Sequence, residues 1–120
     1  MRFVSIAVAV TFLASAGIAQ AQSKQDFRLT NKTGYTIDKV FVAPSKSNDW
    51  EEDILGRDVL ENGAWVNITF PKKNQVCSYD VKVVYDDSTP AEWHNFNLCE
   101  ISKISIFYSH SEDKTWAEYE

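Results

Sequence analysis

Five carboxylates stand close together near the middle of the chain and could do metal chemistry. They are Asp49, Glu51, Glu52, Asp53 and Asp58. Carboxylate oxygens are preferred ligands of Ca²⁺, so this group is the best metal candidate in the sequence. The EF-hand pattern is incomplete, because Ile54 occupies the required glycine position and Leu60 the required glutamate. The alternative interpretation is that these acids mark the start of a helix, where free N–H groups favour negative charge.

A second acidic stretch, Asp86-Asp87-Ser88-Thr89, could form the other half of such a site. Asp and Ser side chains also bond to their own backbone in turns. The composition of this stretch therefore favours a turn over a metal site.

The two histidines, His94 and His110, are the side chains that titrate near neutral pH without help. Strand alternation places Glu92 and His94 together on the face opposite Trp93. A small hydrolase or lyase would use these two as its acid–base pair. The sequence identifies no serine or cysteine nucleophile paired with either histidine, so we assign no catalytic residue and expect solvated surface groups.

The only two cysteines, Cys77 and Cys99, are predicted to form one intramolecular disulfide. A redox or metal-binding pair is the alternative, but the C-x-x-C spacing is absent and no cation near Cys77 would stabilise a thiolate. Alternation along residues 77–85 predicts that one face, with Cys77, Tyr79, Val81, Val83 and Tyr85, points inward.

The first 21 residues have the features of a signal peptide. Arg2 supplies a positive charge, Val4–Ala16 is almost wholly apolar, and Ala19-Gln20-Ala21 suits a signal peptidase. The apolar run of about 13 residues is too short for a membrane-spanning helix, which needs ~20. We therefore expect a periplasmic or secreted domain, residues 22–120, with no transmembrane segment.

The charge of the expected domain is strongly negative. Loss of Arg2 with the leader leaves 11 basic against 17 acidic residues, a net charge of −6 where the full chain has −5. Nucleic acids and anionic lipids are bound largely by Lys and Arg, so neither is an expected partner. No cofactor other than Ca²⁺ is indicated.

The body of the chain is predicted to be all-β. Seven segments show strand alternation or β-branched runs: 27–30, 36–43, 64–70, 77–85, 91–95, 101–108 and 115–119. One short helical turn is expected near residues 48–55, since Trp50 and Ile54 share a helical face and Gly56 could end it. Seven short strands in one domain predict an antiparallel two-sheet sandwich, immunoglobulin-like in arrangement. A small closed barrel has the same signature.

Several segments resemble a family of small exported bacterial proteins of unknown function. They are Asn31–Ile37, Val40–Ser45, Asp49–Asp53 with Leu55-Gly56, Cys77–Val83, Asn97–Cys99 and Lys114–Glu120. Members of that family sometimes bear the name argininosuccinate lyase. The leader and the lack of a Gly-Ser-Ser-rich loop contradict that activity here. The resemblance spans most of the expected domain and implies export without implying a reaction.

These features together predict an exported binding or accessory module rather than an enzyme, with a small molecule or a protein as its ligand. Trp50 and Trp65 are the expected binding residues, because exposed aromatics often anchor ligands. Trp50 could equally cover one end of the core. The alternatives are a calcium-binding envelope protein and a small hydrolase or lyase. A possible edge strand at residues 115–119 leaves room for a dimer.

Overall fold

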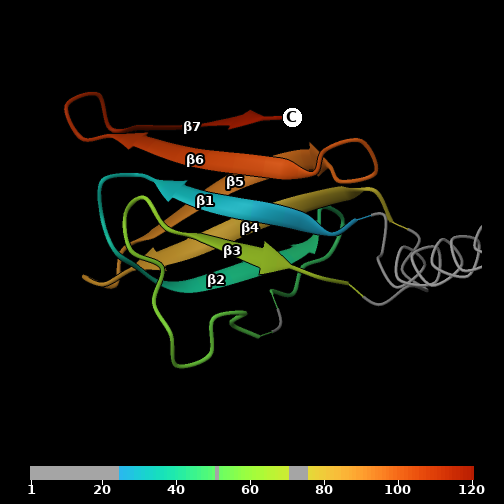
Figure 1. Cartoon of the computed structure of the whole chain (residues 1–120), viewed down its shortest axis with the longest axis horizontal. Helices are drawn as coiled ribbons and strands as arrows, with labels where there is room; N and C mark the ends of the chain where they lie inside the picture. Colours follow the sequence, from blue (N-terminus) through green and yellow to red (C-terminus); the bar gives the residue numbers. More distant parts are fainter. Residues whose placement is uncertain (1–24, 51, 71–75) are drawn as a thin grey trace, which may run out of the picture.

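The chain forms two β-sheets that share one hydrophobic core (Figure 1). The computed structural model describes residues 25–50, 52–70 and 76–120, so the predicted signal peptide lies outside the described residues. Within these ranges no helix is found that is long and apolar enough to cross a membrane.

Seven strands make up the two sheets. Their bounds are β1 Phe27–Lys32, β2 Ile37–Pro44, β3 Trp65–Ile68, β4 Ser78–Tyr85, β5 Pro90–Asn97, β6 Lys103–Ser109 and β7 Lys114–Tyr119. One sheet has the order β3-β1-β6-β7 and the other the order β2-β4-β5. Each strand overlaps one predicted segment, so the prediction of an all-β fold with seven strands is confirmed.

One pair of strands departs from the expected antiparallel arrangement. Strands β1 and β6 pair in parallel, with Arg28 opposite Lys103 and Lys32 opposite Phe107. Parallel neighbours need a long connection, and here the chain forms the whole second sheet before it returns. The prediction of a purely antiparallel fold is therefore wrong at this pair, and the strand order does not confirm an immunoglobulin-like arrangement.

The inward faces of the strands follow the predicted alternation. On β4, Tyr79, Val81, Val83 and Tyr85 are buried while the residues between them are more exposed. The core is a single cluster that also includes Leu29, Ile37, Val40, Trp93, Phe96, Leu98, Ile104 and Ile106. Since both sheets contribute to it, neither sheet buries its apolar face alone.

The expected helical turn near residues 48–55 is wrong, because the described residues of that segment contain no helix. The backbone N–H of Ile54 donates to the carbonyl of Val40 at 2.8 Å. The Asp53 carboxylate in turn accepts from the backbone N–H of Val40 at 2.8 Å. The segment is thus bonded to β2, and these groups are not available for bonds within a helical turn.

A fully buried side chain, Asn31, organises the connections next to β1. Its amide donates to the carbonyls of Tyr35 at 2.8 Å and Leu60 at 2.9 Å. Its side-chain oxygen accepts from the backbone N–H of Thr33 at 3.0 Å and from the Thr33 hydroxyl at 2.6 Å. Every polar group of this side chain is paired, so its burial holds the β1–β2 connection against the segment before β3.

The predicted disulfide between Cys77 and Cys99 is confirmed, with 5.2 Å between the two Cα atoms. It joins the residue before β4 to the segment that follows β5. The inward orientation expected for Cys77 is wrong, because this residue is exposed. Strand β4 begins at Ser78, so the alternation of the strand no longer fixes the direction of Cys77. A disulfide in so small a domain is compatible with an oxidising compartment.

Replacing both Cys77 and Cys99 with Ser should lower the free energy of unfolding by about 3 kcal/mol, because the bridge closes a loop that the unfolded chain otherwise leaves free. Denaturant titration of the two proteins measures the difference. A reducing agent should destabilise the native protein by a similar amount and leave the double variant unchanged. Free thiols in the native protein would contradict the assignment.

Asn31→Ala should lower the free energy of unfolding by roughly 2 to 3 kcal/mol, since it leaves buried carbonyl and N–H groups without partners. Asn67→Ala, at an exposed position on β3, is the matched control and should change stability little. Equal effects of the two substitutions in chemical denaturation would show that the Asn31 bonds contribute no stability.

Candidate binding pocket

Three connections meet at one end of the molecule and enclose a pocket of about 500 Å³. They are the β1–β2 connection, the β4–β5 turn and the β6–β7 loop, which lie together at the left of Figure 1. The chemically active residues that line the pocket are Tyr35, Tyr85, Tyr108, Asp86, Asp87, Glu92, Asp113 and His110. We call this site the tyrosine pocket. Its volume lies in the range of sites that bind small molecules.

The three tyrosine rings of the pocket contact one another. The ring centroids of Tyr35 and Tyr85 are 6.0 Å apart, those of Tyr35 and Tyr108 are 5.9 Å apart, and those of Tyr85 and Tyr108 are 6.4 Å apart. Tyr85 ends the buried face of β4, and Tyr108 continues the inward face of β6 beyond Ile104 and Ile106. The sheets therefore supply two rings, and the β1–β2 connection supplies the third.

The three rings differ in their exposure to solvent. Tyr35 is 43% exposed, whereas the Tyr85 hydroxyl is shielded from solvent. Burial, partly opposed by the Thr33 hydroxyl, raises the pKa of Tyr85 above its ordinary value. Loss of solvation and the hydrogen bond to Asp113 raise the pKa of Tyr108. Neutral tyrosine rings present an electron-rich face that attracts cations.

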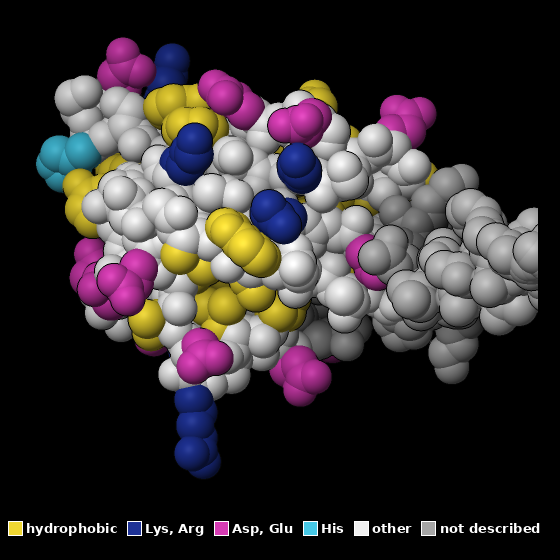
Figure 2. All heavy atoms as spheres, viewed as in Figure 1, with side chains coloured by type: hydrophobic (Ala, Val, Ile, Leu, Met, Phe, Trp, Pro, Cys, Tyr) yellow, Lys and Arg dark blue, Asp and Glu magenta, His cyan; other side chains and the backbone are white. Residues whose placement is uncertain are grey.

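Carboxylates surround the tyrosines. The Asp87 carboxylate accepts from the Thr89 hydroxyl at 2.6 Å and from its backbone N–H at 3.0 Å, and these bonds lower its pKa. This geometry confirms the turn expected at residues 86–89. No lysine or arginine is found among the described residues that line the pocket, so its charge is negative. Figure 2 shows acidic, hydrophobic and histidine side chains grouped at the same end.

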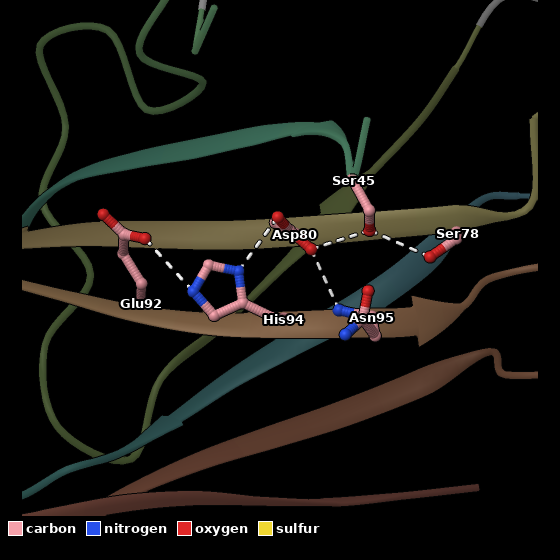
Figure 3. Close-up of polar contacts among 6 residues, drawn as sticks. All are labelled: Ser45, Ser78, Asp80, Glu92, His94 and Asn95. Carbon is pink, nitrogen blue, oxygen red and sulfur yellow. Dashed lines mark hydrogen bonds and ion pairs between the residues drawn. The ribbon is translucent and has the colours of Figure 1, made fainter. Parts of the chain in front are cut away.

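A second polar group, the carboxylate–histidine cluster, consists of Asp80, Glu92 and His94 (Figure 3). The Nδ1 atom of His94 lies 2.9 Å from Asp80, and its Nε2 atom lies 3.2 Å from Glu92. The Glu92–His94 pair thus lies opposite the buried Trp93, as alternation predicts.

A β-bulge places Asp80 against this histidine. The register shifts between Tyr79 and Val81, so Asp80 lies opposite two residues of β5, His94 and Asn95. Asn95 has a φ of +65°, and its backbone N–H donates to Asp80 at 2.9 Å. The bulge therefore turns this side of β5 toward the carboxylate.

Both partners in the cluster favour ionisation. The hydrogen bond to Asp80 raises the pKa of His94 above its ordinary value of 6.5, and the charge of Glu92 adds to the effect. Burial raises the pKa of Asp80, but hydrogen bonds from Ser45, a backbone N–H and His94 outweigh it and hold the pKa below 3.8. A protonated ring can donate to both carboxylates, so these contacts favour the charged form of His94.

Among the described residues, the hydroxyl that contacts this cluster is that of Ser45, and it is directed to the carboxylate. The Ser45 hydroxyl donates to Asp80 at 2.7 Å and is paired with Ser78, so it lies on the side of the carboxylate away from the histidine (Figure 3). His94 is not among the residues that line the tyrosine pocket, whereas Glu92 is. The structure thus brings the side chains of His94 and Glu92 into contact, but the two residues do not line one common pocket.

The remaining predicted site residues are separated. Trp50 is half-buried, with the Lys82 ammonium 6.0 Å above its ring, on the sheet that contains β4. Trp65 is 51% exposed on the other sheet, and Arg28 lies 3.9 Å above its ring. The structure therefore does not bring the two predicted binding tryptophans into one site.

The acidic stretch proposed for Ca²⁺ is only partly described, because Glu51 lies outside the described residues. Asp53 is hydrogen-bonded to the backbone, whereas Glu52 and Asp58 are exposed. Within the described ranges no group of three or more His, Cys, Asp or Glu side chains is arranged to hold a metal ion. Calcium binding at this stretch stays a prediction.

Comparison of the chain with protein-family models, curated proteins and solved structures finds no match. The candidate site is therefore assigned from its geometry.

The sequence analysis missed the tyrosine pocket. Alternation along residues 77–85 predicts an inward-facing Tyr85, but no prediction groups it with Tyr35, Tyr108 or His110. The convergence of Tyr35 with Tyr108 depends on the parallel pairing of β1 with β6, which alternation does not reveal. The available signal was the position of each tyrosine at or near the end of a predicted strand.

Because His94 has a raised pKa in the folded protein, its contacts stabilise the fold fully below the ordinary pKa of 6.5 and are lost as pH rises through the folded value. The unfolding free energy of the native protein should therefore fall as pH increases from about 6 to about 8. His94→Gln should remove this dependence, whereas His110→Gln should keep it. Denaturant titrations over the pH series measure the slope, and an unchanged slope in His94→Gln would contradict the cluster.

Proposed function

We propose that this protein is an exported binding module and that its tyrosine pocket binds a positively charged organic ligand. The observation that carries the proposal is the convergence of three tyrosine rings and four carboxylates on one pocket without a lysine or arginine among its described lining. The ligand class is a quaternary or primary ammonium group, or a guanidinium group, carried by a small molecule or a peptide side chain.

The chemistry of the pocket suits such a ligand in two ways. A cation over a tyrosine ring gains about 0.5 to 2 kcal/mol, more where water is excluded. Tyr85 is largely buried and Tyr35 is partly exposed, so the pocket offers one ring that is shielded from water and one that a ligand can reach from solvent. The carboxylates of Asp86, Asp87 and Asp113 add long-range attraction that raises the rate of encounter with cations.

Export is proposed from features outside the pocket. The first 21 residues have the pattern of a signal peptide, and the disulfide between Cys77 and Cys99 suits an oxidising compartment. The resemblance to small exported proteins agrees with both. We further propose that the two sheets form a sandwich that binds ligands with the connections at one end, as immunoglobulin-like domains do.

A binding role is favoured over catalysis by the carboxylate–histidine cluster. His94 is held by two carboxylates, and no nucleophile lies beside it among the described residues. The observations therefore offer no step for a hydrolase or lyase built on His94 and Glu92.

Choline should bind the purified protein, and 3,3-dimethyl-1-butanol, its uncharged analogue of similar shape, should bind at least tenfold more weakly, because only choline carries the charge that the rings and carboxylates attract. Isothermal titration calorimetry measures both. Tyr35→Leu should weaken choline binding by about tenfold. Tyr119→Leu, an exposed tyrosine outside the pocket lining, is the control and should bind choline normally.

Equal affinity for choline and its neutral analogue would contradict a cation site. If neither choline nor arginine amide, lysine amide or a polyamine binds at millimolar concentration, the proposed ligand class is wrong.

A further inference from the structure

The outer face of the sheet β3-β1-β6-β7 has a composition unlike the rest of the protein. The residues Leu29 and Ile106 of β1 and β6 point into the core, so the residues that alternate with them point outward. The outward set of the four strands is Arg28, Thr30, Lys32, Trp65, Asn67, Lys103, Ser105, Phe107, Ser109, Lys114, Trp116 and Glu118. We call this surface the outer face.

Positive charge is concentrated on this face. Four of its residues are basic and one, Glu118, is acidic, although the whole chain has 12 basic and 17 acidic residues. Figure 2 views this side of the molecule and shows dark blue basic side chains interspersed with yellow hydrophobic ones. The local charge is therefore opposite in sign to the net charge of the protein.

The aromatic residues of the outer face take part in two exposed stacks, one with an arginine and one between two aromatic rings. The Arg28 guanidinium lies 3.9 Å above the Trp65 ring, and Trp65 is 51% exposed. Phe107 and Trp116 are stacked with 5.1 Å between centroids and 6° between planes, and Trp116 is 44% exposed. Cross-strand stacking of this kind fixes the orientation of the rings and lowers the entropy that a ligand must remove on binding.

The register sets the distance between the stacks. Thr30 lies opposite both Trp65 and Ser105, while Phe107 lies opposite Lys32 and Trp116. Trp65 and Trp116 are therefore separated by three inter-strand spacings across the sheet and by two residues along the strands. These separations correspond to about 14 Å and about 7 Å. A linear polymer of several rings could contact both stacks and the basic residues between them.

We propose that the outer face binds an anionic polysaccharide, with sugar rings stacked on Trp65 and Trp116 and carboxylates paired with the basic side chains. Charge complementarity identifies the partner as anionic, and the exposed rings of an open sheet face suit the flat faces of sugars. Nucleic acid is less favoured, because its affinity comes largely from neutralising closely spaced phosphates and this face offers four basic residues. The site is separate from the tyrosine pocket, so neither proposal depends on the other.

The test uses a galacturonic acid oligomer as the probe, its fully methyl-esterified form as the neutral control, and oligothymidylate as the nucleic acid control. The acidic oligomer should alter tryptophan fluorescence and bind at least tenfold more tightly than the neutral one. Its affinity should fall on the order of tenfold when ionic strength rises from about 0.02 to about 0.2 M, since exposed charges are screened.

Substitutions locate the site. Trp65→Ala and Trp116→Ala should each weaken binding by roughly tenfold, whereas Trp65→Tyr should retain most of the affinity because a ring remains. Lys103→Gln should weaken binding about threefold. Lys39→Gln, an exposed charge on β2 of the other sheet, is the matched control and should leave binding unchanged. Circular dichroism confirms that each variant is folded.

Four results would overturn the proposal. The first is tighter binding of oligothymidylate than of the acidic oligomer, and the second is equal binding of the charged and neutral oligomers. The third is an identical affinity of Trp65→Ala, Lys103→Gln and the native protein. The fourth is salt-sensitive self-association, without oligomer binding, which would assign the outer face to a second copy of the chain. Choline binding should be unaffected by these substitutions.

Discussion

The parallel ladder between β1 and β6 is the constraint on which the rest of the structure depends. It places β1 in the interior of a four-stranded sheet, between β3 and β6, so that Leu29 is fully buried. It also sets Phe107 opposite Lys32. Both strands then end at the same side of the molecule, where Tyr35 follows β1 and Tyr108 lies near the end of β6. One pairing thus builds the basic outer face and brings the tyrosines together.

Much of this fold could be predicted from the sequence because burial repeats every second residue along a strand. The alternation along β4 predicted Tyr79, Val81, Val83 and Tyr85 as core residues. The presence of only two cysteines predicted the disulfide. Strand partners could not be predicted, since alternation is the same in parallel and antiparallel pairs. The helix expected near Trp50 failed for a related reason: the bonds to Val40 come from β2, which is distant in sequence.

The candidate sites were less predictable than the strands. Alternation predicted that Glu92 and His94 share one face of their strand. The contact between Asp80 and His94 depends on a β-bulge, and the residue pattern does not indicate that bulge. Trp65 was expected to be an exposed aromatic residue, although its stacking with Arg28 requires knowledge of the neighbouring strand. The tyrosine pocket draws on three connections, and the sequence gives no indication of which connections share an end.

Acidic residues line the tyrosine pocket while basic residues predominate on the outer face, so the two surfaces carry local charges of opposite sign. If the outer face binds a polyanion as proposed, attraction to a negatively charged matrix favours an approach with the four-stranded sheet first. The pocket is lined by residues at the end of the sheets, and none of them belongs to the outer face. A molecule adsorbed in this orientation would keep its pocket accessible from the side, so an immobilised layer of the protein could still take up cations from the surrounding solution.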